Sequence, residues 1–154
     1  MLWWAVDPDD RVYLYREWYG ASAPNEGLKL PVQEVAEGIT AREAMDGKVI
    51  GYADPAIWGT ETGESVAEMF AKAGVWFAKG DHDRMAGKMQ LHNRLAFDEN
   101  GIPMLYVFSN CREFIRTLPA LVYSQTRVED VDTDGEDHSY DAARYFLMTR
   151  PCGV

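Results

Sequence analysis

Residues 2–18, LWWAVDPDDRVYLYREW, carry the pattern that decides the fold class. Two stretches rich in aromatic and β-branched residues, Leu2 to Val6 and Arg11 to Trp18, flank the run Asp7-Pro8-Asp9-Asp10. Aromatic and β-branched residues favour strands, and Pro and Asp favour the turn between them. The pattern therefore predicts a β-hairpin.

The rest of the chain alternates short strands with helices. Short buried strands are predicted at Val49 to Ala53, which ends at Asp54-Pro55, and at Val75 to Ala78. The other predicted elements are helices around Pro31 to Ile39, over Thr62 to Ala73 and over Arg84 to Leu95 with Asp83 as cap, a second hairpin of Leu95 to Phe97 and Met104 to Phe108, a helix capped by Asn110 that runs toward Tyr123, and a last helix over His138 to Met148. This order predicts a single α/β domain over residues 1–154, with a mixed sheet.

Composition is that of an ordinary globular protein. The chain has 154 residues, of which 47% are hydrophobic and 26% are charged, which suits one soluble domain with a core of its own. Apolar runs such as Leu2 to Val6 are far shorter than a membrane span, so no membrane association is expected. Two cysteines without a metal-like spacing, Cys111 and Cys152, indicate a reducing compartment. We expect a cytoplasmic protein.

Negative charge is concentrated in one segment. The chain has 25 acidic against 15 basic residues, a formal net charge of −10, which argues against a protein that coats nucleic acid with its whole surface. Seven of the acids lie between Glu129 and Asp141, and the other 18 nearly balance the 15 bases. We therefore look for chemistry in this acidic segment first.

Three side chains are candidate metal ligands. Asp54 follows a predicted strand, at the strand end where open α/β sheets place ligand groups. His138 and Asp141 are three residues apart at a predicted helix start, so they share a face. Carboxylates that converge in one cleft suit Mg²⁺ or Mn²⁺. The alternatives are purely structural: an Asp-Pro turn at Asp54, and a helix cap at Asp137.

Two other patterns remain open. The spacing Asp130-x-Asp132-x-Asp134-Gly135 followed by Asp141 matches a calcium loop with Asp in the last position, although a solvated acidic loop explains it as well. Arg84, Lys88 and His92 recur every four residues with Arg94 nearby, as on a solvated helix face or on one that holds DNA phosphates. A phosphate-binding loop is absent, so a nucleotide-hydrolysing motor is excluded.

The motifs together resemble the carboxyl-terminal part of the large terminase subunit of tailed bacteriophages and prophages. The most specific is Asp137-His138-x-x-Asp141-Ala142-x-Arg144-Tyr145, preceded by Glu129-Asp130-Val131-Asp132-Thr133 within Tyr123 to Met148. The upstream order agrees, with Tyr13 to Tyr19 ending the hairpin, then Ala53-Asp54-Pro55, then Asp83-Arg84-x-x-Gly87. The likeness covers essentially the whole chain.

This resemblance implies a ribonuclease-H-like mixed sheet flanked by helices. It further implies a two-metal endonuclease that cuts concatemeric viral DNA during packaging, in the bacterial host cytoplasm. Asp54 and Asp141 would be the catalytic metal ligands for Mg²⁺ or Mn²⁺, with His138 as an additional ligand or proton-handling group. Arg84, Lys88 and Arg94 would bind double-stranded DNA. The implied partners are the packaging ATPase domain, which is missing here, the small terminase subunit and the portal protein.

The sequence departs from the family at its start. The family's first metal-binding Asp lies on a strand before the hairpin that begins here at Leu2, so we expect a domain without its first strand. The predicted consequences are an incomplete metal site, little nuclease activity, and self-association through exposed strand edges. The alternative function is a non-enzymatic packaging or interaction domain, or an inactive prophage remnant.

Overall fold

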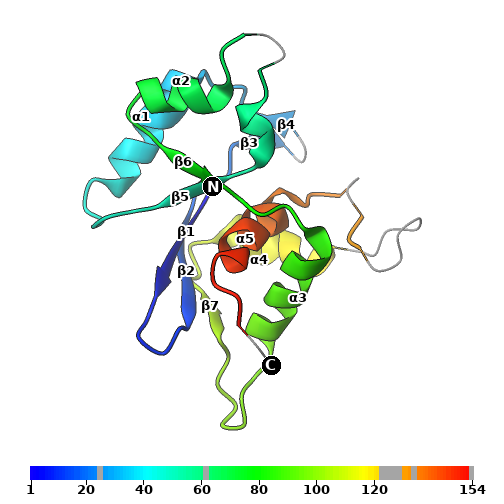
Figure 1. Ribbon diagram of the computed structural model, residues 1–154. Helices are drawn as coiled ribbons and strands as arrows, with labels where there is room; N and C mark the ends of the chain where they lie inside the picture. Colours follow the sequence, from blue (N-terminus) through cyan, green and yellow to red (C-terminus); the bar gives the residue numbers. More distant parts are fainter. Residues whose placement is uncertain (24–25, 61–62, 122–129, 133–134, 153–154) are drawn as a thin grey trace. The chain divides into compact units, whose positions relative to one another are not determined.

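The computed structural model describes residues 1–23, 26–60, 63–121, 130–132 and 135–152 (Figure 1). The chain divides into two compact units: Met1–Gly27 with Asp83–Val154 form unit 1, and Leu28–His82 form unit 2. Both units contain strands and helices, so the chain is a mixed α/β protein as predicted. The single domain over residues 1–154 stays a prediction.

Unit 1 is built on a three-stranded mixed sheet in the order β1-β2-β7. β1 (Leu2–Val6) pairs antiparallel with β2 (Val12–Glu17), and β2 pairs in parallel with β7 (Leu105–Val107). The carboxylate of Asp7 accepts a hydrogen bond from the backbone N–H of Arg11 at 2.9 Å within the first turn. The predicted hairpin and the predicted mixed sheet are both confirmed. Unit 1 also contains a small antiparallel sheet of β3 (Ala21–Ala23) and β4 (Glu26–Gly27).

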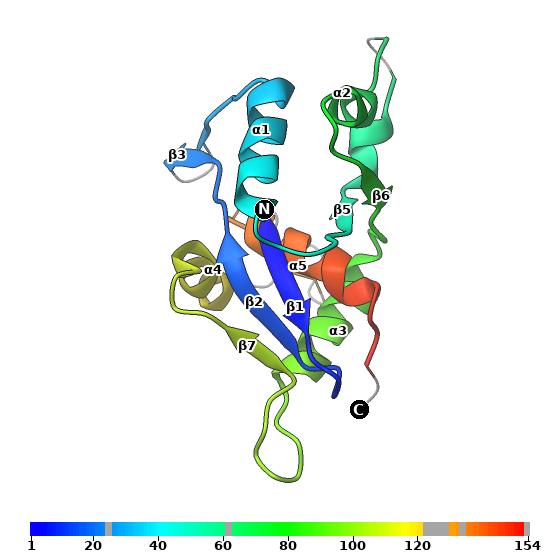
Figure 2. The ribbon, with the colours of Figure 1, turned by 90° about the vertical axis from the view of Figure 1, so that its left-hand side faces the viewer.

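Three α-helices pack on one face of this sheet, where Figure 2 shows them behind the strands. They are α3 (Arg84–Leu95), α4 (Arg112–Thr117), which continues into the 3-10 helix η2 (Leu118–Ala120), and α5 (His138–Met148). Side chains of the sheet and of all three α-helices meet in the core, namely Val12, Leu14, Leu91, Leu105, Phe114, Ala143 and Leu147. The core therefore lies between this sheet and its helices.

Local sequence signals set the bounds of α3 and α5. The carboxylate of Asp83 accepts a hydrogen bond from the backbone N–H of Ala86 at 2.9 Å and caps α3. In α5 the buried side chains of Tyr140, Ala143 and Leu147 recur at helical spacing and face the core. Both helices, and the cap of α3, are confirmed where the sequence predicts them.

The start of α4 differs from its prediction. Asn110 was expected to cap this helix, but its side-chain amide donates to the carbonyl oxygen of Tyr15 at 3.1 Å, and Cys111 occupies the N-cap position. The carboxylate of Glu17, at the end of β2, accepts hydrogen bonds from two backbone N–H groups in the first turn of α4, at 2.7 and 2.9 Å. The prediction that Asn110 caps α4 is wrong, because the carboxylate of Glu17, which is distant in sequence, binds the N–H groups at the start of this helix.

Only the turn of the second predicted hairpin forms, between its predicted strands Leu95 to Phe97 and Met104 to Phe108. A single bridge joins Phe97 to Pro103. Pro103 has no N–H with which to continue a ladder, and the backbone beyond it pairs with β2 as β7 instead. The turn itself forms, with the carboxylate of Asp98 accepting two backbone hydrogen bonds at 2.8 Å each.

Unit 2 consists of α1 (Val32–Glu43), β5 (Gly51–Ala53), the 3-10 helix η1 (Pro55–Trp58), α2 (Val66–Lys72) and β6 (Phe77–Lys79). β5 and β6 pair in parallel as a two-stranded sheet, and α1 contacts α2. The sequence predicts a buried strand at β5, but Ile50 and Tyr52 are exposed. That part of the prediction is wrong, because two strands of three residues form too small a sheet to bury both faces.

The helix α2 begins later than predicted. Ser65 is its N-cap: the Ser65 hydroxyl accepts a hydrogen bond from the backbone N–H of Glu68 at 3.2 Å, and the Glu68 carboxylate accepts one from the N–H of Ser65 at 2.8 Å. This reciprocal capping box fixes the start of the helix at Val66. The start that the sequence predicts, Thr62, lies outside the described residues.

Some predicted features are not covered by the structure. The stretch toward Tyr123, and Glu129, Thr133 and Asp134 of the acidic segment, lie outside the described residues. Among the helices that are described, none is long and apolar enough to cross a membrane. The expected cytoplasmic location stays a prediction.

Candidate functional site

The acidic segment leads into α5, and α3 packs against that helix. Gly87 of α3 lies against the side chain of Arg144 of α5. A Cβ atom at position 87 would lie 3.0 Å from the Cβ atom of Arg144 and 3.1 Å from its Cγ and Cδ atoms. Glycine therefore permits the close approach of the two helices, and Arg84, one turn earlier on α3, reaches the first turn of α5.

Five side chains form what we call the arginine–aspartate cluster: Arg84, Arg144, Asp130, Asp137 and Asp141. Nε of Arg84 donates to Oδ2 of Asp130 at 2.8 Å, and its Nη1 donates to Oδ1 of Asp141 at 3.4 Å. Nη2 of Arg84 lies 3.9 Å from Oδ2 of Asp137. Arg144 donates to the same Oδ1 of Asp141 through Nε at 3.1 Å and also through Nη2. Two guanidinium groups thus converge on one oxygen of Asp141.

The surroundings of the cluster shift the pKa values of two of its carboxylates in opposite directions. Burial alone would raise the pKa of Asp130, but hydrogen bonds from Arg84 and from the N–H of Val131 outweigh it and lower this pKa. Burial raises the pKa of Asp137, and the negative charge of Asp141 adds to this rise. The cluster therefore favours an ionised Asp130, whereas an ionised Asp137 is costly.

The guanidinium groups retain donors that the cluster does not use. Nη2 of Arg84, Nη1 of Arg144 and the hydroxyl of Tyr140 are buried and have no hydrogen-bond partner in the part of the chain that the structure describes. The Arg144 guanidinium lies over the Tyr140 ring, 5.2 Å from its centroid, and this contact stabilises the cation partly in place of hydrogen bonds.

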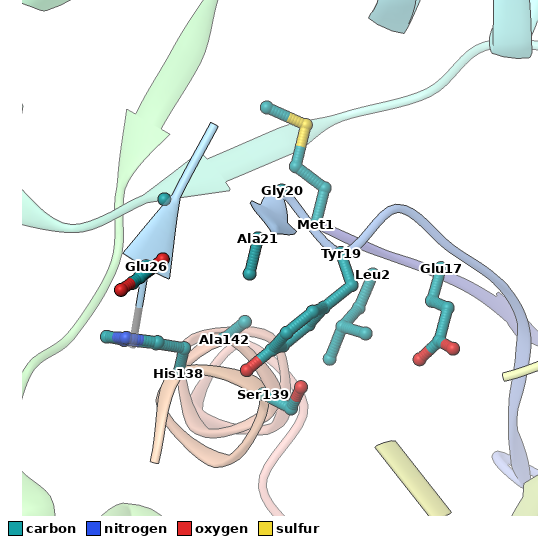
Figure 3. Close-up of a pocket in the computed structure, with 11 residues that line it drawn as sticks. Met1, Leu2, Glu17, Tyr19, Gly20, Ala21, Glu26, His138, Ser139 and Ala142 are labelled. Carbon is teal, nitrogen blue, oxygen red and sulfur yellow. The ribbon is translucent and has the colours of Figure 1, made fainter. Parts of the chain in front are cut away.

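His138 and Asp141 are on one helix turn, and of the two only His138 is among the described residues that line the pocket in Figure 3. The side chain of His138 is 67% exposed, and its Nδ1 lies 3.9 Å from Oδ1 of Asp137. Figure 3 shows His138 next to Glu26 among the residues that line a pocket in unit 1. The volume of this pocket is about 220 Å³. Asp141 is not among the described residues that line it. The predicted convergence of His138 and Asp141 on one ion stays a prediction.

Asp54 lies in unit 2, at the end of β5 as predicted. Its Oδ1 accepts a hydrogen bond from the backbone N–H of Ala56 at 2.7 Å, and it caps η1. This is the Asp-Pro turn that the sequence left open as the structural alternative. The residue is exposed. Its convergence with Asp141, which belongs to unit 1, stays a prediction.

The basic residues of α3 do not form one exposed face. Arg94 is fully buried: its Nη2 donates to Oδ2 of Asp10 at 2.8 Å and to the carbonyl oxygen of Arg150 at 2.7 Å. Its side chain thus joins the turn between β1 and β2 to the segment that follows α5. The burial of Arg94 argues against the predicted contact of this residue with DNA. Arg84 belongs to the arginine–aspartate cluster, and Lys88 is half-buried.

In the observed arrangement, the carboxylates of the cluster are not placed to bind a divalent cation. The guanidinium of Arg84 lies between them, and the described residues contain no group of three or more His, Cys, Asp or Glu side chains placed to hold a metal ion. The calcium-loop alternative meets the same obstacle, because Asp130 and Asp141 both accept hydrogen bonds from Arg84. Its middle position, Asp134, lies outside the described residues.

The sequence indicates Asp141 and Arg84 as functional residues, but it does not indicate that their side chains bind each other. The one signal for the cluster was the three-residue spacing of Asp141 and Arg144, which favours an ion pair on a helix. Comparisons with protein-family models, with curated proteins and with solved structures find no match to this chain. The resemblance to the terminase family therefore stays an expectation from the sequence motifs.

Proposed function

We propose that this chain is the nuclease domain of a phage terminase large subunit, with a ribonuclease-H-like topology, and that it hydrolyses phosphodiester bonds of double-stranded DNA. One observation carries the proposal: two of the motifs that resemble this family meet in the folded chain. Gly87 of the first motif lies against Arg144 of the second, and Arg84 donates to Asp141, 57 residues away in sequence. Motifs with a common function are expected to lie together.

Within this proposal Asp141 is the central carboxylate. Its side chain is 27% exposed, whereas those of Asp130 and Asp137 are 9% exposed, so it is the most accessible aspartate of the cluster. Asp54, at the end of β5, is the proposed second carboxylate, and His138 is the proposed proton-handling group. Bound Mg²⁺ or Mn²⁺ would polarise the phosphodiester and generate hydroxide near neutral pH.

The arrangement around Asp141 also predicts weak metal affinity. Two guanidinium groups already neutralise its carboxylate, so a divalent cation gains less by binding there than at a free carboxylate. We therefore propose that the 154-residue chain cuts DNA slowly by itself. The ATPase domain, the small subunit and the portal protein are its proposed partners. For DNA contact we retain Lys88 and Arg84, and not the buried Arg94.

The test is cleavage of supercoiled plasmid DNA by the full chain in excess Mn²⁺. We expect slow nicking that chelation abolishes and that Asp141→Asn lowers at least tenfold, with the fold checked by circular dichroism. Glu99→Gln removes one negative charge from an exposed turn and should cleave like the wild type. Nicking that persists in Asp141→Asn would refute the assignment of Asp141. A folded chain without any Mn²⁺-dependent nicking would favour the non-enzymatic interaction domain.

A further inference from the structure

The sheet of unit 1 has a second face, toward the viewer in Figure 2, which no helix covers in the described part of that unit. The core side chains of Val12, Leu14 and Leu105 point to the helices. Because successive side chains of a strand alternate between its two faces, Tyr13 of β2 and Tyr106 of β7 lie on the opposite side. Both tyrosines are partly exposed. We call this side of β1, β2 and β7 the open face.

Tyr13 and Tyr106 stack against each other on the open face. They are register partners in the parallel pair of β2 and β7. Their ring centroids are 5.0 Å apart, and their ring planes differ by 9°. The hydroxyl of Tyr13 donates to Oδ2 of Asp7 at 2.9 Å, which fixes the orientation of its ring. The two rings are therefore held parallel in advance, which lowers the entropic cost of binding a flat ligand.

Each ring of this pair has one face that the other ring does not cover. The strand order β1-β2-β7 places Tyr13 between Tyr106 and Ala5, which is its register partner on β1. Ala5 is exposed and has only a methyl group as side chain, so this position of β1 leaves room beside the Tyr13 ring. Tyr106 lies on the edge strand of the described sheet. A planar group can therefore stack on either side of the pair.

A positive charge lies next to the tyrosines on β2. The guanidinium group of Arg16 is 5.1 Å from the ring centroid of Tyr15 and 5.6 Å from that of Trp3, and these cation–π contacts hold it in place. Guanidinium groups bind phosphate oxygens with well-defined geometry. Arg11, just before β2, is already paired with Asp9 at 2.5 Å. An anionic group is therefore best accommodated at the Arg16 end of the open face.

We propose that the open face binds single-stranded nucleic acid, with unpaired bases stacked on Tyr13 and Tyr106 and the phosphate backbone directed toward Arg16. Every base has a flat face, so bases stack on aromatic side chains with little dependence on sequence. The bases of double-stranded DNA are already stacked on one another and do not reach these rings. The net charge of −10 predicts weak binding that salt weakens further. This inference goes beyond the proposed nuclease function and does not require it.

The experiment is titration of a fluorescently labelled oligothymidine with the full chain, followed by anisotropy at low salt. EDTA is present, so metal-dependent cleavage takes no part. Tyr106→Leu keeps an apolar side chain but removes the flat ring, and it should weaken binding by about fivefold or more. Tyr106→Trp keeps a flat ring and should bind at least as tightly as the wild type. The matched control is Tyr52→Leu, at an exposed tyrosine of unit 2, which should bind like the wild type.

A further variant covers the case in which the Tyr106 variants do not fold, since a cross-strand aromatic pair also stabilises the sheet. Arg16→Gln keeps all the tyrosine rings and removes the charge. It should weaken oligothymidine binding and reduce the slope of log affinity against log salt concentration by about 0.7, the value for one phosphate contact with a single strand. Thermal unfolding shows which variants are folded.

Several outcomes would overturn the inference. Equal oligothymidine binding by the wild type and the folded Tyr106→Leu variant would leave the tyrosine pair a purely structural feature. A loss that Tyr52→Leu shares, or equally tight binding of double-stranded DNA, would contradict stacking of unpaired bases on this face. Binding of a proline-rich peptide that depends on Tyr106, without any binding of oligothymidine, would assign the open face to a protein partner.

Discussion

Arg144 places a guanidinium group in the interior of unit 1, where it is 1% exposed. Asp141, three residues earlier on α5, supplies the countercharge, so formation of the helix brings the pair together. Removal of one partner of a buried ion pair costs about 3–5 kcal/mol, because the other charge stays buried. Arg94 lacks such a local partner and depends on Asp10, 84 residues away. The partner of Arg144 is thus a near neighbour in sequence, whereas the partner of Arg94 is distant in sequence.

Gly87 gives the first testable prediction at this scale. Gly87→Ala places a methyl group 3.0 Å from the Cβ atom of Arg144. Because this Cβ atom is bonded to the backbone, a change of rotamer cannot move it aside. Overpacking costs about 1–3 kcal/mol, and the better helix propensity of Ala returns about 1 kcal/mol. We expect the free energy of unfolding to fall by up to about 2 kcal/mol in urea titrations. Gly20→Ala, where nothing lies within 4 Å, is the control. A higher stability of Gly87→Ala than of the wild type would contradict the close approach of α3 and α5.

At the scale of elements, α4 shows how a helix start depends on the tertiary structure. Its first turn carries no capping side chain of its own, and the carboxylate of Glu17 from β2 accepts the hydrogen bonds of two of its N–H groups. A carboxylate at this end also interacts favourably with the helix dipole. The contact therefore ties the end of β2 to the start of α4, and it stabilises the sheet and the helix together.

A pair of substitutions separates the observed cap from the one that the sequence suggested. Glu17→Gln removes the charge and one of two acceptor oxygens, and we expect it to lower the free energy of unfolding by about 1 kcal/mol. Asn110→Ala removes one exposed hydrogen bond to Tyr15 and should cost less than about 0.5 kcal/mol. Chemical unfolding of the two variants under the same conditions provides the comparison. A larger loss for Asn110→Ala would return the capping role to Asn110.

At the scale of the whole molecule, the small sheets leave strand edges without a neighbour. Within the described residues β1 pairs with β2 on one side only, and β5 and β6 pair only with each other. The backbone groups of an edge strand that lack a neighbour invite pairing with another chain. The sequence predicts exposed strand edges, and the strand order of the described sheets agrees with that prediction.

We therefore predict concentration-dependent self-association through β1, measured by sedimentation equilibrium. Ala5 is exposed on β1, and Ala5→Lys places a charge on this edge, which should weaken the association at least tenfold. Ala120→Lys, at an exposed position of η2, adds the same charge away from the sheet and should associate like the wild type. A chain that is monomeric at all concentrations, or association that Ala5→Lys leaves unchanged, would refute the role of β1.

Much of the fold was predictable because its signals are local. Alternating strand formers around an Asp-Pro turn specify the first hairpin, and an Asp cap followed by helical spacing specifies α3. The bounds of α5 follow from its apolar spacing in the same way. The pairing of β7 was not predictable, since strand partners are chosen by burial across the whole sheet, and Pro103 interrupts the local hairpin that its turn favours.

The sequence by itself determined which residues carry charge and where helices present them: Arg84 at the start of α3, and His138 and Asp141 in the first turn of α5. Only the tertiary structure decided what these charges meet. It placed Arg84 between Asp130, Asp137 and Asp141. It also buried Arg94 against Asp10, in the turn between β1 and β2. The physical reason is that helix periodicity is a property of neighbouring residues, whereas an ion pair between α3 and α5 depends on helix packing, which Gly87 permits by the absence of a side chain.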